Sequence, residues 1–190
     1  MIDPMSSLAI SMHSKKGAYA LLIGSGVSKT AQIPTGWDIV LSLIKSVACV
    51  EGKDCGAIPE AWYRETYREE PSYSVLLERL GIMPAERNQI LRKYIEPSPE
   101  ERDLGLKLPT EAHRAIAELV ASGFVRVILT TNFDRLLETA LGEMGVVPAI
   151  IDSADAVKGT LPLVHNACTI LKLHGDYIDS RIRNTTDELA

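Results

Sequence analysis

The sequence contains little cysteine and no cysteine-based metal motif. Its 190 residues include three cysteines, Cys49, Cys55 and Cys168, and none belongs to a C-x-x-C pair. A zinc module with four cysteine ligands therefore cannot be built from this chain, and we expect no metal. Because a signal peptide is also missing, we expect a reduced, cytoplasmic protein.

Long apolar runs and an excess of basic residues are missing as well. The longest apolar runs, such as Ala18–Ile23 and Val125–Leu129, are far too short to cross a bilayer, so no membrane partner is expected. The formal net charge is −5, which argues against direct nucleic-acid binding because that needs a basic face. A small anionic ligand stays compatible with this charge, since backbone N–H groups at a helix start can bind phosphate.

The residues that are present alternate between strand and helix patterns. Apolar residues make up 46% and charged residues 24%, as in soluble globular chains. Apolar runs predict strands at 18–23, 125–131, 146–151 and 168–175, and helical spacing predicts helices at 37–50, 110–123 and 132–145. Residues 58–96 look helical in pieces, and 96–109 look like a loop. This order predicts an α/β fold, a Rossmann-like doubly wound parallel sheet with helices on both faces.

Composition and pattern also divide the chain. Residues 1–17 are a mixed, serine-rich N-terminal lead-in, either frayed or a short helix, and residues 18–190 form one domain with a helical insertion at about 52–109. Polar residues follow three of the predicted strands, in the segments 24–26, 130–134 and 174–176. Ligands bind at the carboxyl ends of the strands in doubly wound sheets, so we expect these three segments to meet at one site.

Each segment has a structural explanation when it is taken alone. Glycines after a strand often form only a turn, and Asn132 or Asp134 could simply cap the following helix. A lone histidine such as His174 is more often structural than catalytic, and Trp37 could be a packing residue. The other three histidines receive only the structural interpretation, namely His13, His113 and His165.

The glycine loop fits neither of two familiar phosphate-binding motifs. "GSGVSKTAQIP" (residues 24–34) has Lys29 where G-x-G-x-x-G needs its third glycine. A P-loop needs glycine directly before its lysine, and Ser28 stands there. No acidic strand end for Mg²⁺ is evident either, which argues against a P-loop NTPase.

Three motifs taken in order resemble the Sir2 family. Its G-A-G-x-S and G-I-P correspond to "GSGVSKTAQIP", its T-Q-N-x-D to "TTNFD" and its catalytic histidine-glycine to "LHGD". The tryptophan after the proline and the second threonine look most like the Sir2-like, NAD-degrading domains of bacterial anti-phage defence proteins, and "RIRNTTDEL" (181–189) resembles a segment of that branch. The resemblance covers most of the chain from about residue 18.

The resemblance implies a site and a reaction. NAD is the expected substrate, with NAD or ADP-ribose as ligand, and 18–190 is then a Sir2-like NAD-binding domain. Asn132 and His174 are the implied catalytic residues, because an amide orients the ribose or water without titrating and histidine titrates close to neutral pH. The implied NAD-binding residues are Gly24, Ser25, Gly26, Ser28, Pro34, Trp37, Thr131, Asp134 and Gly175.

The chain also departs from the family pattern. Sirtuin deacylases place Asp-Phe-Arg after the proline, whereas "TGWD" stands here, and their zinc cysteines are missing. The family continues beyond histidine-glycine with further motifs that do not follow Ala190, so we expect a C-terminally truncated, incomplete domain. A partner protein, a further domain and a homo-oligomer all stay open.

Three functions follow from the resemblance. The first is an NAD glycohydrolase, in which water attacks the ribose carbon that carries nicotinamide. The second is an NAD-dependent protein deacylase, in which an acetyl-lysine oxygen attacks the same carbon. The third is a non-catalytic module that binds NAD, ADP-ribose or a partner protein. The missing zinc module favours the first over the second.

Overall fold

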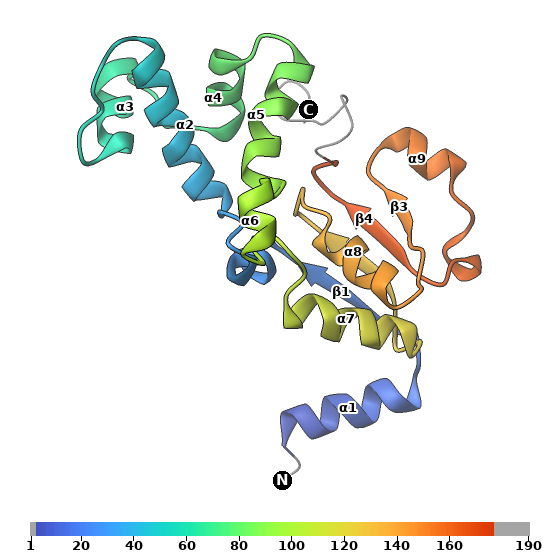
Figure 1. Ribbon diagram of the computed structural model, residues 1–190. Coiled ribbons are helices and arrows are strands. Elements are labelled where there is room, and N and C mark those ends of the chain that lie inside the picture. Colours follow the sequence, from blue (N-terminus) through green and yellow to red (C-terminus); the bar gives the residue numbers. More distant parts are fainter. Residues whose placement is uncertain (1–2, 177–190) are drawn as a thin grey trace.

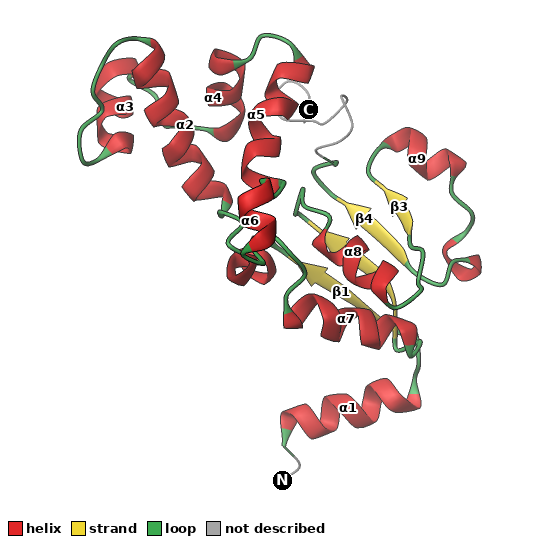
Figure 2. Ribbon diagram, viewed as in Figure 1, coloured by secondary structure: helices red, strands yellow, loops and turns green. Residues whose placement is uncertain are grey.

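The computed structural model describes residues 3–176, which form a parallel sheet surrounded by helices (Figures 1 and 2). The strands are β1 (Tyr19–Ile23), β2 (Val125–Thr130), β3 (Ala149–Ile151) and β4 (Thr169–Lys172). Their order in the sheet is β1-β2-β4-β3, and every neighbouring pair is parallel. The predicted Rossmann-like α/β fold class is confirmed.

The helices differ in length and in the part of the molecule that they occupy. The α-helices are α1 (Pro4–Ser14), α2 (Gly36–Val50), α3 (Pro59–Tyr67), α4 (Tyr73–Leu80), α5 (Pro84–Ile95), α6 (Pro99–Asp103), α7 (Glu111–Ala121), α8 (Leu136–Glu143) and α9 (Ala154–Gly159). Two short 3₁₀ helices are η1 (Ser25–Ala31) and η2 (Leu163–His165). Within residues 3–176, no single helix is long and apolar enough to span a membrane, although the bent pair η1 and α2 meets the length and composition criteria.

Helices lie on both faces of the sheet. α7 and α8 lie side by side on one face (Figure 1), where Ile150 and Ile170 belong to the same core as residues of both helices. Side chains alternate along a strand, so Ile151 and Leu171 point to the other face. These two line a cavity together with Val157 of α9, which places α9 on that second face.

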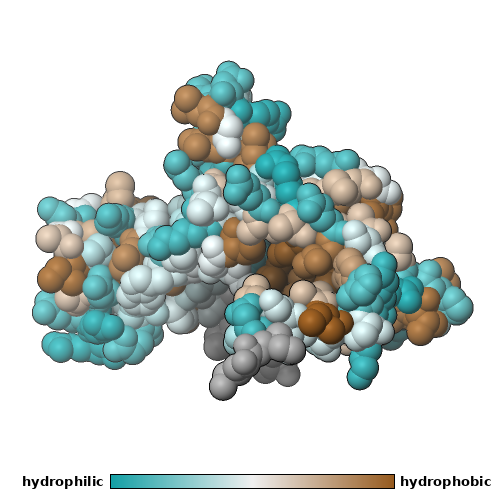
Figure 3. Space-filling view, turned by 90° about the horizontal axis from the view of Figure 1, so that it is seen from below, coloured by the Kyte–Doolittle hydropathy of each residue, from teal (hydrophilic) through white to brown (hydrophobic). Residues whose placement is uncertain are grey.

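The second face is only partly covered in the described part of the chain. Leu22 in β1 is 72% exposed, and Leu129 in β2 is half-buried. Seen from below, hydrophobic residues gather around a hollow near the centre of the surface (Figure 3). Helix α1 extends away from the sheet (Figure 1) and buries none of its residues.

Helices α2, α3, α4 and α5, here called the helical cluster, have a core of their own beside the sheet (Figure 1). Leu43 and Ile44 of α2 are fully buried against Tyr63, Leu76 and Leu91. These apolar residues recur at helical spacing, so each helix buries one stripe and exposes the rest. The chain passes from β1 through η1 and a short connection into α2, so α2 joins the sheet to the rest of the helical cluster.

Several boundaries differ from the sequence-based expectation, and the strand expected at 146–151 begins only at Ala149. The predicted loop at 96–109 contains α6, which begins at a capping box between Ser98 and Glu101. The helix expected at 132–145 begins only at Leu136, because residues 131–135 form an irregular loop. The strand expected at 168–175 ends at Lys172, so His174 lies in a turn.

Candidate functional site

The carboxyl ends of β1, β2 and β4 meet at one edge of the sheet. The Thr131 amide donates to the Ile23 carbonyl at 3.2 Å, and the Leu173 amide donates to the Thr130 carbonyl at 2.8 Å. Gly24 lies so close to this junction that a Cβ there would be 3.4 Å from Thr131 Oγ1. The loop after β2 thus lies directly against the residue that follows β1.

A buried hydrogen-bond network holds the Asn132 side chain in one orientation. Its Nδ2 donates to Ser28 Oγ at 3.1 Å and to Asp134 Oδ2 at 3.2 Å. Ser28 Oγ in turn donates to Asp134 Oδ2 at 2.8 Å. Because a carboxylate only accepts hydrogen bonds, Asp134 fixes which end of the Asn132 amide carries the nitrogen.

The carbonyl oxygen of Asn132 has no hydrogen-bond partner among residues 3–176. Asn132 is 8% exposed, and its Oδ1 atom is buried without a hydrogen bond. A buried acceptor without a partner carries a desolvation cost of about 1–3 kcal/mol, which a ligand donor would relieve. A hydroxyl group of a bound sugar is a donor that fits this position.

Asp134 serves the site and the helix at the same time. Its Oδ1 accepts the Leu136 amide at 3.1 Å, which satisfies an N–H group at the start of α8, while its Oδ2 binds Ser28 and Asn132. One carboxylate oxygen therefore supports the start of α8, and the other contacts the Asn132 side chain, while the expected contact of Asp134 with NAD stays a prediction.

His113 of α7 lies beneath this network. Thr110 caps α7, and its backbone N–H donates to His113 Nδ1 at 3.2 Å. Because Nδ1 accepts, the ring proton of neutral His113 lies on Nε2, which is 3.4 Å from Ser28 Oγ. Burial lowers the pKa of His113, against the opposing effect of the Asp134 charge, and so favours the neutral ring.

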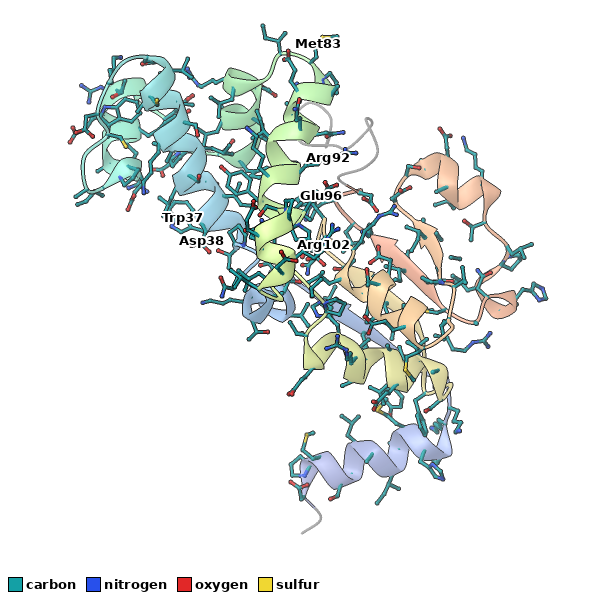
Figure 4. The ribbon with its side chains drawn as sticks, in the orientation of Figure 1. Trp37, Asp38, Met83, Arg92, Glu96 and Arg102 are labelled. Carbon is teal, nitrogen blue, oxygen red and sulfur yellow. The ribbon has the colours of Figure 1, made fainter. Side chains whose placement is uncertain are left out.

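A cavity of about 400 Å³ opens in front of Asn132, between the sheet edge and the helical cluster. Seven of the residues that the sequence singled out line it: Ser25, Pro34, Trp37, Thr131, Asn132, Asp134 and His174. The helical cluster contributes an apolar wall that includes Ile39, Val40, Tyr73 and Ile95. Trp37 and Asp38 lie at the start of α2, where the cluster meets the sheet (Figure 4).

His174 lies beside an aromatic side chain of the Asn132 loop. The rings of His174 and Phe133 are 6.2 Å apart, and Phe133 stacks on Tyr73 of α4 at 6.2 Å with an interplanar angle of 12°. His174 is exposed and also lines a second cavity, of about 430 Å³, together with Gly175. The histidine therefore faces both cavities.

Four of the predicted site residues do not line the first cavity. Gly24 directly precedes η1 and Gly26 lies in it, and both are exposed. Gly175 lines the second cavity. Ser28 is fully buried, with its hydroxyl group in the network below Asn132. We expected Ser28 to contact the ligand phosphates or ribose, but in this structure its hydroxyl supports Asn132 and Asp134 instead.

Asp38, in the segment that departs from the sirtuin pattern, caps the start of its own helix. Asp38 Oδ2 accepts hydrogen bonds from the Thr35 hydroxyl at 2.7 Å and from the Thr35 amide at 2.9 Å, which completes the capping box of α2. These bonds, with that from the hydroxyl first, hold the pKa of Asp38 below its ordinary value. Among residues 3–176, no group of three or more His, Cys, Asp or Glu side chains is arranged to hold a metal ion.

Sequence reasoning gave His113 only a structural role and did not single out Lys172, and both contact the site from below. The spacing of His113, Ala117 and Val120 places all three on the buried face of α7, and this pattern could have marked His113 as an inward-facing polar residue. Lys172 is a single cation at the end of an apolar strand, where a buried charge needs a partner. Neither signal identifies the partner.

Comparison with known proteins finds a family model that matches part of the chain. Residues 126–189 match the family model of the SIR2-like domain, a segment that contains Asn132, Asp134 and His174. No curated protein matches the chain. The match supports the Sir2-like family, whose domains bind NAD. The segment 181–189, which contributed to the resemblance, lies outside the described residues.

Proposed function

We propose that this protein hydrolyses NAD at the bond between nicotinamide and ribose. The observation that carries the proposal is the Asn132 carbonyl oxygen, which is buried, oriented and without a partner at the wall of a cavity that His174 also lines. The SIR2-like match supports NAD as the ligand.

The chemistry requires charge stabilisation on the sugar. The bond from ribose C1′ to the ring nitrogen breaks, and its electron pair goes to nicotinamide, which leaves as a neutral molecule. The ribose carries oxocarbenium-like charge in the transition state, as in glycoside cleavage. Water then bonds to C1′ and loses a proton, so the products are ADP-ribose, nicotinamide and H⁺.

The residues divide this work by their chemistry. Asn132 would accept a hydrogen bond from a ribose hydroxyl or from the attacking water and so orient it. His174 would take the proton of the water as general base. Asp134 and Ser28 would hold the Asn132 amide, through the contacts of 2.8–3.2 Å between the three side chains.

The remaining predicted residues would bind the rest of the nucleotide. Ser25 and Thr131, which both carry hydroxyl groups, line the cavity, and a Cβ added to Gly26 would meet open space. This surface suits phosphate oxygens, which need hydrogen-bond donors and close approach. The apolar wall with Tyr73 and Phe133 suits the flat nicotinamide ring.

The setting of this activity is proposed from the resemblance alone. We propose a role in bacterial anti-phage defence, with a partner protein or a second copy as regulator. Two alternatives use the same residues: a protein deacylase and a module that binds NAD or ADP-ribose without turning it over. Both predict a different product pattern from hydrolysis, so one experiment separates the three.

The experiment is chromatography of NAD incubated with the protein. We expect nicotinamide and ADP-ribose from the wild type, and a fall in rate of about 10²–10⁴-fold for His174→Ala and for Asn132→Ala. His165→Ala is the matched control, because His165 is an exposed histidine on η2. Adding an acetylated peptide tests deacylation, which would give acetyl-ADP-ribose.

Two results would contradict the assignment. Wild-type rates in both Asn132→Ala and His174→Ala would remove these residues from the reaction. NAD binding without any nicotinamide release would replace hydrolysis by the binding-module alternative.

A further inference from the structure

Three largely buried charged side chains and one partly exposed arginine form a cluster next to the site, and the proposed reaction uses none of them. This charge cluster consists of Lys172, Arg135, Glu138 and Asp176. Lys172 is 4% exposed and Asp176 is 1% exposed. Charges are costly to bury even in pairs, so such a cluster needs an explanation beyond stability.

Lys172 lies at the centre of the charge cluster. Its Nζ is 2.7 Å from Glu138 Oε1 and 3.0 Å from Asp176 Oδ2. The same Nζ donates to the Asp134 carbonyl at 2.9 Å. One ammonium group therefore donates hydrogen bonds to a loop and a turn and forms an ion pair with a carboxylate of helix α8.

Two of these contacts lead to the two proposed catalytic residues. The Asp134 carbonyl belongs to the loop that carries Asn132, and the Asp134 carboxylate accepts from Asn132 Nδ2 at 3.2 Å. Asp176 follows His174 by two residues, in the turn where the Gly175 amide donates to the Lys172 carbonyl at 3.2 Å. Lys172 thus contacts the Asn132 side and the His174 side at once.

Arg135 provides a second connection between the same two segments. Its Nε is 2.8 Å from Asp176 Oδ2, and it follows Asp134 directly in the chain. With two cations and two carboxylates, the charge cluster is formally neutral. Burial raises the pKa of Glu138, and Lys172 acts in the opposite direction.

We infer that Lys172 is a positioning residue that fixes the Asn132 loop relative to the His174 turn. This inference rests on the proposed function for its catalytic consequence. A small change in the relative position of reacting groups lowers kcat strongly, whereas substrate affinity depends on the wider cavity. A purely structural Lys172 would affect unfolding and leave kcat unchanged in the folded protein.

The test uses a charge-balanced double variant, Lys172→Met with Glu138→Leu. Lys172→Met alone would leave two buried carboxylates with less compensation and would threaten folding, whereas the double variant removes one charge of each sign. The matched control is Arg64→Gln with Glu70→Gln, which removes an exposed pair in the helical cluster. Asp176→Asn is a milder second variant that keeps the shape of the side chain.

The measurements are kcat and KM for nicotinamide release and amide hydrogen exchange at 131–135 and 173–176. In the double variant we expect kcat to fall by about 10²-fold with KM changed far less, and exchange to accelerate in both segments. Asp176→Asn should accelerate exchange mainly at 173–176. The control should match the wild type in every measurement.

The outcomes separate the inference from the proposed function. A folded double variant with wild-type kcat, or with wild-type exchange in both segments, overturns the positioning role. A wild type that releases no nicotinamide overturns the proposed hydrolysis, and the exchange comparison still decides whether Lys172 holds the two segments together.

Discussion

His113 supports the site through its tautomer. The Thr110 amide donates to Nδ1, so the neutral ring presents Nε2–H toward Ser28, and the Ser28 hydroxyl donates a hydrogen bond to Asp134. A protonated His113 would place a positive charge in a pocket where the ring is 1% exposed. Burial disfavours that form, and the Arg114 charge adds to this effect.

Protonation of His113 should make the free energy of unfolding depend on pH. Its folded pKa is lowered, so the unfolded chain binds the proton more readily, and the contribution to stability is present above about pH 6.5 and lost as the pH falls. We expect the free energy of unfolding of the wild type to fall below that pH by up to about 1.4 kcal/mol per pH unit for this one proton. His113→Gln should flatten this dependence.

Urea unfolding at about pH 7 and about pH 5.5 measures the effect. His165→Gln is the control, because this exposed histidine should leave the pH dependence of the wild type unchanged. Parallel stability curves for wild type and His113→Gln would contradict the prediction.

At the residue scale, the sequence identified side chains better than their roles. The order of polar strand ends was enough to select Asn132, Asp134 and His174. Ser28 was expected to face the ligand, but its hydroxyl group contacts Asp134, 106 residues away in the sequence, and no local pattern reports such a distance. The structural role expected for His113 agrees with its buried position, but the sequence could not identify Ser28, 85 residues away, as its contact. A serine after a glycine loop looks the same whether its hydroxyl faces a ligand or an aspartate.

At the element scale, capping chemistry and periodicity gave reliable boundaries where both were present. Thr110 caps α7 as predicted, and the helix predicted at 37–50 is α2, which begins at Gly36. α6 was missed because a five-residue helix has no apolar stripe, although Ser98 and Glu101 have the spacing of a capping box. α8 begins late because the Asn132 loop contributes its side chains and backbone to the site.

Helix α2 should dominate the stability of the helical cluster. Leu43 is fully buried at the centre of its apolar stripe, in contact with the core that α3, α4 and α5 share. We expect Leu43→Ala to lower the free energy of unfolding by about 2–5 kcal/mol, because the cavity cannot close against three packed helices. Lys45→Ala, at an exposed position of the same helix, should change it little.

Urea unfolding followed by circular dichroism checks this prediction. If both substitutions shifted the midpoint equally, the helical cluster would not have the core described here. A lower unfolding midpoint for Leu43→Ala alone would show that the core of the helical cluster contributes to the stability of the protein.

At the scale of the whole molecule, the cavity is lined by residues of both the sheet edge and the helical cluster. The sheet supplies Asn132 and His174, and the helical cluster supplies the wall with Tyr73 and Val40. The stacked rings of Tyr73 and Phe133 connect the two bodies directly. The sequence predicted the sheet and a helical insertion, but the position of one against the other depends on contacts between distant residues and could not be predicted.

Trp37 tests whether the helical cluster takes part in binding. It is 49% exposed at the start of α2 and lines the cavity opposite the strand ends. A side chain that contacts bound NAD equally in the ground state and the transition state contributes to KM and not to kcat. We therefore expect Trp37→Ala to raise KM by about tenfold, the equivalent of about 1.4 kcal/mol, with kcat nearly unchanged.

Trp37→Phe is the matched variant, since it keeps an aromatic face at the cavity and should raise KM less. Steady-state kinetics of nicotinamide release gives both constants for the two variants. A fall in kcat with constant KM would place Trp37 at the reacting bond instead, and unchanged constants would mean that NAD does not reach α2. The expected result would make the helical cluster part of the NAD site, because Trp37 is its first aromatic residue and α2 joins it to the sheet.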